Sequence, residues 1–230
     1  MGRYHFVFPR WSNLLLPAVM VLGAVMPMYV ALVVAYGFSP LTTDVGYRPV
    51  QPVPYSHALH AGTLGIDCRY CHNTVERTAR ASIPPTQTCM NCHTQIHKDS
   101  PLIAPLLESY QTGMPVPWER VHDLPDFAYF NHSAHVTRGV SCVECHGRID
   151  KMERVYQHET LAMGWCLNCH RDPESRVRDP KLVTNLAWGL RLDAASGKWV
   201  MDEELRLDES LRWIDINQIA PSQNCSTCHR

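Results

Sequence analysis

The apolar residues of this chain are concentrated in one block near its N-terminus. Residues 11–43 include no charged side chain, and residues 14–36 are almost entirely apolar. A helix of that length can cross the apolar part of a bilayer, which takes about 20 residues. Trp11 and Phe38 lie near its ends, where membrane proteins carry aromatic residues. We therefore predict a single membrane-spanning helix within residues 11–38.

A cleaved signal peptide is the alternative, because it shares the basic start and the apolar core. The apolar run is longer than a usual signal core, and no clear small-x-small cleavage site follows it. Arg3 and Arg10 precede the run, so the positive-inside rule predicts a cytoplasmic tail at residues 1–10. Residues 39–54 are rich in proline and predict an extended tether, with the remainder of the chain on the external face.

The chain beyond the tether contains five copies of Cys-x-x-Cys-His, the attachment signature of c-type haem. In it, two thiols bond the porphyrin and the following histidine binds the iron as its proximal ligand. The ten cysteines of the chain all belong to these motifs. In chain order the motifs are Cys68, Cys71 and His72; Cys89, Cys92 and His93; Cys142, Cys145 and His146; Cys166, Cys169 and His170; and Cys225, Cys228 and His229.

A zinc site is the serious alternative, since the first four cysteines have spacing that a zinc ribbon would accept. Zinc does not require a histidine directly after the second cysteine of each pair, and here all five pairs have one. The sequence therefore predicts five covalently bound c-type haems.

Five haems leave few residues each for an ordinary protein core within residues 55–230. The predicted fold is accordingly mostly irregular with short α-helices, one N-terminal transmembrane helix and a multihaem cytochrome c domain whose porphyrins form the interior. The formal net charge is −1, and haem propionates would make the protein more acidic. Without a basic run, nothing in the sequence favours nucleic-acid binding.

An internal repeat covers four of the motifs, with copies at residues 55–93 and 130–170. Each copy has two motifs preceded by a His-x-x-His pair, which supplies one spare imidazole per haem. These candidate distal ligands are His57, His60, His132 and His135. The fifth motif, at residues 225–229, lies outside the repeat and needs a ligand from elsewhere.

The segment Phe-Asn-His-Ser-x-His ahead of the third motif resembles the class III multihaem cytochromes of the c3 and c7 types. That resemblance implies duplicated dihaem units. It also implies that His132 caps the haem on His146, that His135 caps another haem, and that His57 and His60 do likewise in the first copy.

Residues 118–171 resemble, more closely still, the pentahaem membrane-anchored subunit of alternative complex III, a bacterial quinol oxidoreductase. The single anchor and the haem number extend this resemblance to most of the chain. It implies an electron-transfer subunit in the cytoplasmic membrane that passes electrons toward a periplasmic cytochrome or copper protein. The implied partners are an iron–sulfur-type subunit, polytopic quinol-binding subunits and a monohaem cytochrome c.

Two other functions remain open at this stage. One is a NapC/NrfH-type quinol dehydrogenase, which also has a single anchor and four or five haems. The other is a multihaem reductase, which would need an iron with an open position. The supply of histidines disfavours the reductase, and the repeat disfavours the dehydrogenase.

The distal ligand of the fifth haem is predicted from the spare histidines. His122 lies in a proline-bounded turn just before the second copy and is the preferred candidate, with Met152 or Met163 as a thioether alternative. The tryptophans of residues 183–217 are predicted to form a small core patch or to dock against a partner.

Overall fold

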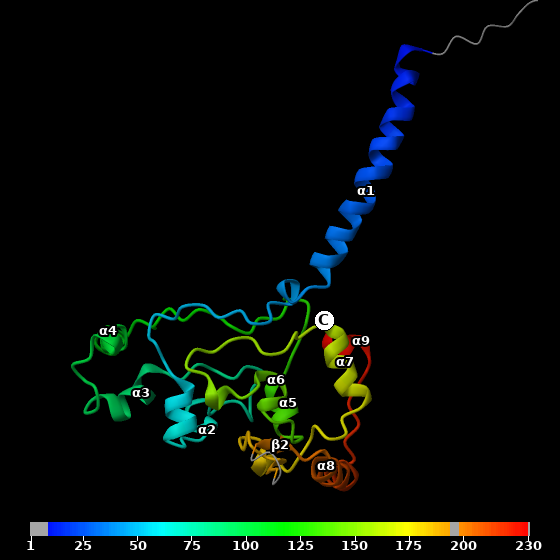
Figure 1. The fold of residues 1–230 in the computed structure, drawn as a ribbon. Coiled ribbons are helices and arrows are strands. Elements are labelled where there is room, and N and C mark those ends of the chain that lie inside the picture. The colour runs from blue at the N-terminus through cyan, green and yellow to red at the C-terminus, as the bar shows by residue number, and fades with distance from the viewer. Residues whose placement is uncertain (1–8, 194–197, 230) are drawn as a thin grey trace, which may run out of the picture. The chain divides into compact units, whose positions relative to one another are not determined.

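The computed structural model describes residues 9–193 and 198–229. The chain separates into two compact units, one ending at Asp44 and the other beginning at Val45. Both are drawn in Figure 1. Arg3, on which the predicted orientation in the membrane partly depends, lies outside the described residues.

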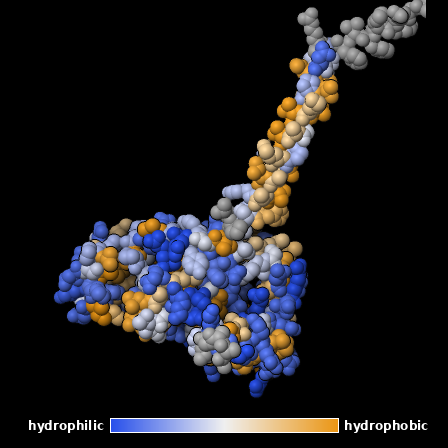
Figure 2. All heavy atoms as spheres, viewed as in Figure 1, coloured by the Kyte–Doolittle hydropathy of each residue, from blue (hydrophilic) through white to orange (hydrophobic). Residues whose placement is uncertain are grey.

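The first unit consists mainly of α1 (Leu15–Gly37), with 3₁₀ turns at Arg10–Leu14 and Pro40–Thr43 on either side. No residue of α1 is buried, and Figure 2 shows apolar side chains along the face in view. Pro27 lies inside the helix, which membrane helices tolerate. The helix is long and apolar enough to cross a membrane. The prediction of one apolar N-terminal helix is therefore confirmed.

The second unit is mostly irregular chain with short helices, as predicted from the sequence. Helical turns that are not α-helical lie at Ala58–Thr63, Pro101–Ile103, Ile149–Lys151 and Pro180–Leu182. The α-helices are α2 (Cys68–Cys71), α3 (Thr86–His93), α4 (Ala104–Thr112), α5 (His132–Val136), α6 (Val143–His146), α7 (Met163–Arg171), α8 (Glu203–Asn217) and α9 (Cys225–Cys228). In Figure 1, α5 and α6 lie between α2, α3 and α4 on one side and α7 and α9 on the other.

A small antiparallel hairpin precedes α8. It pairs β1 (Leu190–Leu192) with β2 (Trp199–Met201), and Arg191 lies opposite Val200. The sequence analysis did not predict this hairpin. It also did not predict α8, which begins where the Asp202 carboxylate accepts a hydrogen bond from the backbone N–H of Leu205 at 3.1 Å.

Side-chain caps begin two of the shortest helices. The Asp67 carboxylate accepts a hydrogen bond from the backbone N–H of Arg69 at 2.8 Å, directly before the first motif. The Asn131 side chain accepts one from Ser133 at 3.0 Å, at the start of the second His-x-x-His segment. These side chains accept hydrogen bonds from backbone N–H groups that have no carbonyl partner within so short a helix. They therefore fix the residue at which each helix begins.

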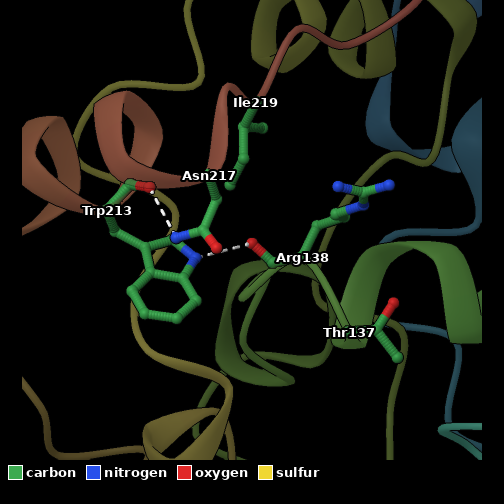
Figure 3. A pocket seen from close by; sticks show the side chains of 5 residues that line it. All are labelled: Thr137, Arg138, Trp213, Asn217 and Ile219. Carbon is green, nitrogen blue, oxygen red and sulfur yellow. Dashed lines mark hydrogen bonds between the residues drawn. The ribbon is translucent and has the colours of Figure 1, made fainter.

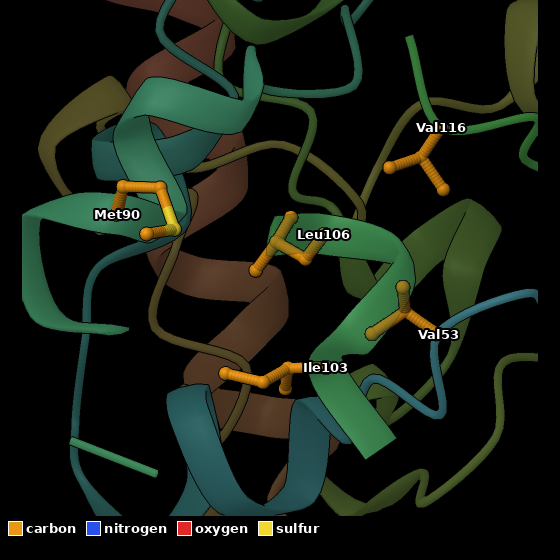
Figure 4. Packing of buried hydrophobic residues seen from close by; sticks show 5 residues of the cluster. All are labelled: Val53, Met90, Ile103, Leu106 and Val116. Atoms are coloured by element: carbon orange, nitrogen blue, oxygen red, sulfur yellow. The ribbon is translucent and has the colours of Figure 1, made fainter. Parts of the chain in front are cut away.

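One apolar cluster holds the second motif in place. It contains Val53, Met90, Ile103, Leu106 and Val116, which Figure 4 shows converging from α3, the α4 region and two extended segments. Met90 lies between the two cysteines of the second motif. The cluster therefore fixes that motif by packing.

Two crossing segments hold the third motif. Val140 and Val177 form an isolated β-bridge, and the backbone N–H of Arg178 donates to the Gly139 carbonyl at 2.9 Å. Gly139 has φ +92°, and a Cβ there would clash with the Arg178 carbonyl oxygen. Only glycine combines that backbone conformation with so close an approach. Val183 then accepts a backbone hydrogen bond from Cys142 at 3.3 Å.

The protein core of the second unit is small. Among the described residues, the buried hydrophobic side chains are Val53, Met90, Ile103, Leu106, Val116, Val136, Met152, Val177, Val183, Leu186 and Trp188. Eleven such residues are few for a unit that begins at Val45 and continues to the C-terminal region. This agrees with an interior that bound haem completes.

Candidate haem-binding sites

Each Cys-x-x-Cys-His motif lies on one short helical turn, in α2, α3, α6, α7 or α9. Residues three apart in a helix project from the same face, so each turn presents both thiols together. All ten cysteines are free thiols in the structure. They are therefore available for thioether bonds to haem.

Zinc is the alternative to haem at the cysteine pairs. In the described residues, no group of three His, Cys, Asp or Glu side chains converges as metal coordination would require. The choice between haem and zinc therefore rests on the histidine that follows each cysteine pair.

Seven histidines share one hydrogen-bonding arrangement, in which Nδ1 faces a backbone carbonyl oxygen. A carbonyl can only accept, so the proton must lie on Nδ1, and Nε2 keeps its lone pair for a metal. The Nδ1-to-oxygen distances are 2.8 Å for His60 with Ser56, His72 with Ser82, His132 with Ala79 and His135 with Asn131; 2.9 Å for His93 with Ile96; 2.6 Å for His170 with Ser222; and 3.0 Å for His229 with Phe127.

Three distal candidates lie opposite proximal histidines at the separation that a shared iron requires. An imidazole nitrogen binds a metal at about 2 Å, and its ring centre lies roughly 1.1 Å further back, so two rings on one ion are about 6 Å apart. The ring centres are 6.3 Å apart in His60 and His93, 6.4 Å in His132 and His146, and 6.0 Å in His135 and His170. These residues therefore fit iron held between two imidazoles.

The two His-x-x-His segments have nearly the same local geometry. Tyr55 lies edge-on to His57 at 4.8 Å and stacks on His60 at 4.4 Å. In the second segment, Phe130 makes the corresponding contacts with His132 at 4.8 Å and His135 at 4.5 Å. An aromatic ring two residues before each pair thus fixes both imidazoles.

His57 lies near the proximal histidine of the first motif. Burial, with a smaller contribution from the nearby His72, lowers the pKa of His57 to about 4. The Nδ1 atom of His57 is buried without a hydrogen-bond partner. Burial also lowers the pKa of His146 to about 3. Both imidazoles are therefore neutral near pH 7, the form that binds metals.

The structure brings His122 to the third motif. Its Nε2 is 3.3 Å from Nδ1 of His146, and the two rings meet edge-on with centres 4.4 Å apart. Its predicted role as a ligand of the fifth haem stays a prediction. Of the thioether alternatives, Met163 is exposed on α7, and Met152 is buried beside the first His-x-x-His segment, where its carbonyl accepts a hydrogen bond from Ala58.

Neighbouring thiols show which motifs adjoin. Burial raises the pKa of Cys71, and the neighbouring Cys89 and Cys92 raise it as well; a hydrogen bond between Cys68 and Cys142 lowers the pKa of Cys68. Burial also raises the pKa of Cys145 and of Cys166, with further increases from Cys169 and Cys166 for Cys145 and from Cys228 for Cys166. The motifs thus adjoin in the order second, first, third, fourth, fifth. Figure 1 shows α3, α2, α6 and α7 in this order, with α9 beside α7.

A buried charge network beside the third motif was missed by the sequence analysis. Glu144, between the two cysteines, accepts hydrogen bonds from Arg178 at 2.5 Å and Arg206 at 2.8 Å. The Arg178 guanidinium lies 4.1 Å from the centre of the Trp188 ring. Burial raises the pKa of Glu144 although both arginines lower it, and burial lowers the pKa of Arg178 to about 10. The only available signal was a charged residue inside the motif.

The tryptophans of residues 183–217 differ in exposure, and the predicted docking against a partner stays a prediction. Trp188 is 9% exposed and forms part of the core, whereas Trp199 is 69% exposed. Trp213 lines a pocket of about 210 Å³ with Thr137, Arg138, Asn217 and Ile219, shown in Figure 3. Its indole N–H donates to the Arg138 carbonyl at 3.3 Å. The pocket is smaller than typical ligand sites, which begin at about 300 Å³, and contains none of the predicted haem ligands.

Two comparisons with known proteins agree with these sites. Residues 128–230, which include the third to fifth motifs, match the family "Cytochrome c7 and related cytochrome c". The chain is also 27% identical over 171 residues to the menaquinone reductase multihaem cytochrome c subunit of Nitratidesulfovibrio vulgaris, covering 64% of this chain and 81% of that protein. Residues 128–230 are therefore similar to the c7-type multihaem cytochromes, a family that implies covalently bound c-type haems.

Proposed function

We propose that this chain is the five-haem electron-transfer subunit of a membrane quinol:acceptor oxidoreductase of the alternative complex III type. The observation that carries the proposal is the set of paired imidazoles at 6.0–6.4 Å beside the attachment motifs. A histidine on each face of an iron leaves no open position for a substrate, so such sites relay electrons. The relationship to a menaquinone reductase subunit supports a link to quinone.

Bound haem supplies reversible one-electron oxidation at each site. The chain's own residues hold and orient it. The cysteine pairs would provide the covalent bonds, while the Nδ1-to-carbonyl hydrogen bonds fix seven of the imidazole rings and leave Nε2 available to the metal. Tyr55 and Phe130 hold the two rings of their His-x-x-His segments at a constant angle. The matching contacts support two duplicated dihaem units, with the fifth haem beyond them.

The proposed assembly contains an iron–sulfur-type subunit, polytopic quinol-binding subunits and a monohaem cytochrome c. In it, α1 anchors the chain in the cytoplasmic membrane, and the haem-bearing unit lies on the external face. The second and fifth motifs are the ends of the row of adjoining sites, so these ends are the proposed points of electron exchange with partners. The name of the relative favours a second candidate, in which electrons pass in the other direction, to menaquinone.

The first expected result is a count of five haems. Mass spectrometry of the denatured, full-length protein should give the mass of the chain plus five covalent haems. Because each iron is expected to have two axial ligands, electron paramagnetic resonance of the oxidised native protein should show low-spin signals only. A mass with four or fewer haems, or a high-spin signal from a whole haem, would contradict the proposal.

The second expected result concerns quinone. In right-side-out vesicles that contain the native complex, a reduced menaquinone analogue should reduce the c-type haem, measured by absorbance. Protease added outside should release the haem-bearing unit. Vesicles containing this chain without other subunits are the control and should show no reduction by quinol.

Haem that dithionite reduces but no quinol reduces would exclude the function. Reduction in the control vesicles would instead support the NapC/NrfH-type activity. If added menaquinone oxidises reduced haem faster than menaquinol reduces oxidised haem, electrons pass from haem to menaquinone, as the name of the relative implies.

A further inference from the structure

The proximal histidine of the third motif differs from the other proximal histidines in the partner of its Nδ1 atom. In His72, His93, His170 and His229, Nδ1 faces a backbone carbonyl oxygen. In His146, it faces Nε2 of a second imidazole, that of His122, at 3.3 Å. The rings meet at 86° with their centres 4.4 Å apart, so the edge of one points at the other.

We propose that His122 is a positioning residue for the third haem, which accepts the Nδ1–H hydrogen bond of the proximal ligand His146. His146 binds iron through Nε2 and must carry its proton on Nδ1. The lone pair of His122 must then lie on Nε2, and its own proton on Nδ1. This assignment rests on haem attachment at the third motif and does not depend on the quinol partner.

The segment that carries His122 is fixed to the rest of the unit. Glu119, three residues earlier, is held from both sides by Gln51. The Gln51 amide donates to the Glu119 carbonyl at 2.8 Å and accepts from its N–H at 3.0 Å. Directly after His122, Asp123 forms an ion pair with Arg120 at 2.6 Å. The ring of His122 is therefore presented from an anchored turn.

The hydrogen bond has a chemical consequence for the haem. A histidine that donates its second N–H becomes a more basic metal ligand, and the acceptor orients its ring. A more basic ligand stabilises ferric iron over ferrous iron and lowers the reduction potential. Because the third motif is the middle of the five adjoining sites, its potential affects transfer between the two copies of the repeat. His122 is thus expected to tune the central site.

The test compares three variants of the full-length haem-loaded protein. His122→Leu removes the acceptor, and His122→Gln keeps a side-chain oxygen that can accept. His97→Leu is the matched control, because His97 is exposed and lies outside the motifs. Each protein is titrated with reductant, with potentials followed by absorbance and spin state by electron paramagnetic resonance.

His122→Leu should raise the reduction potential of one haem by about 40 mV for one electron. This corresponds to a change of about fivefold in the equilibrium constant for its reduction, the expected effect of losing one hydrogen bond. His122→Gln should restore most of that shift, and His97→Leu should cause none. All haems should stay low-spin in every variant.

A haem that turns high-spin in either His122 variant would overturn the proposal and make His122 an axial ligand. Unchanged potentials in His122→Leu would also overturn it. If His122→Leu does not assemble, His122→Gln alone decides. An upward shift of one potential by less than about 40 mV, with all haems still low-spin, supports the proposal. The absence of any shift counts against it. These potentials are measured without quinol, so failure here is distinct from failure of the proposed function.

Discussion

Replacing Glu144 with alanine should destabilise the haem-bearing unit by about 3–5 kcal/mol, the usual cost of breaking a buried ion pair from one side. The Arg178 side chain is 1% exposed and the Arg206 side chain 11%, and both donate to the same oxygen of Glu144. Several of their other N–H groups are already buried without a partner. Without the carboxylate, two neighbouring guanidinium groups would remain buried with no counter-charge between them.

The measurement is the free energy of unfolding in guanidinium chloride, followed by circular dichroism. The matched control is Asp123→Ala, which removes the ion pair with Arg120. That pair is as short, at 2.6 Å, but its side chains are 64% and 65% exposed. An exposed pair is worth roughly 0–1 kcal/mol. Equal losses in the two variants would show that burial of the Glu144 network does not stabilise the fold.

Preventing haem attachment should abolish cooperative folding of the unit that begins at Val45. Its apolar core is too small to offset the entropy of ordering so much irregular chain. The free energy of unfolding should fall from the ordinary range of about 5–15 kcal/mol to near zero. Heat unfolding and amide hydrogen exchange of the chain made without haem attachment would measure this.

Two double variants separate a structural role of haem from a general effect of losing thiols. Cys142→Ala with Cys145→Ala removes attachment at the third motif, in the middle of the adjoining sites. Cys225→Ala with Cys228→Ala removes it at the fifth motif, where Cys225 is exposed. We expect a much larger loss of stability from the first pair. Protected amides in residues 140–183 of the haem-free chain would contradict the explanation.

The sequence predicted those parts of the site whose spacing is dictated by local chemistry. A thioether-bound haem needs two thiols and a histidine close together in the sequence, so the motifs can be recognised whatever the fold. The His-x-x-His pairs could be recognised because they recur at matched offsets before the motifs. The structure adds the carbonyl partners of Nδ1, which come from residues as distant as Phe127 for His229, 102 positions away.

Long-range contacts account for what the sequence could not show. Glu144 meets Arg178 and Arg206, which are 34 and 62 residues away, and no local pattern pairs them. The sequence also gives no distance between His122 and His146, so their contact could not be predicted. The α8 helix carried one local signal, its capping Asp202, and a single capping residue does not by itself predict a helix.

The order in which the motifs adjoin has a consequence for biogenesis. The second motif adjoins the first, the third also adjoins the first, the fourth adjoins the third, and the fifth adjoins the fourth. As the polypeptide is made from its N-terminus, every motif after the first emerges next to one that already exists. No haem has to be inserted between two completed neighbours, so the row can be extended outward from the first motif during synthesis.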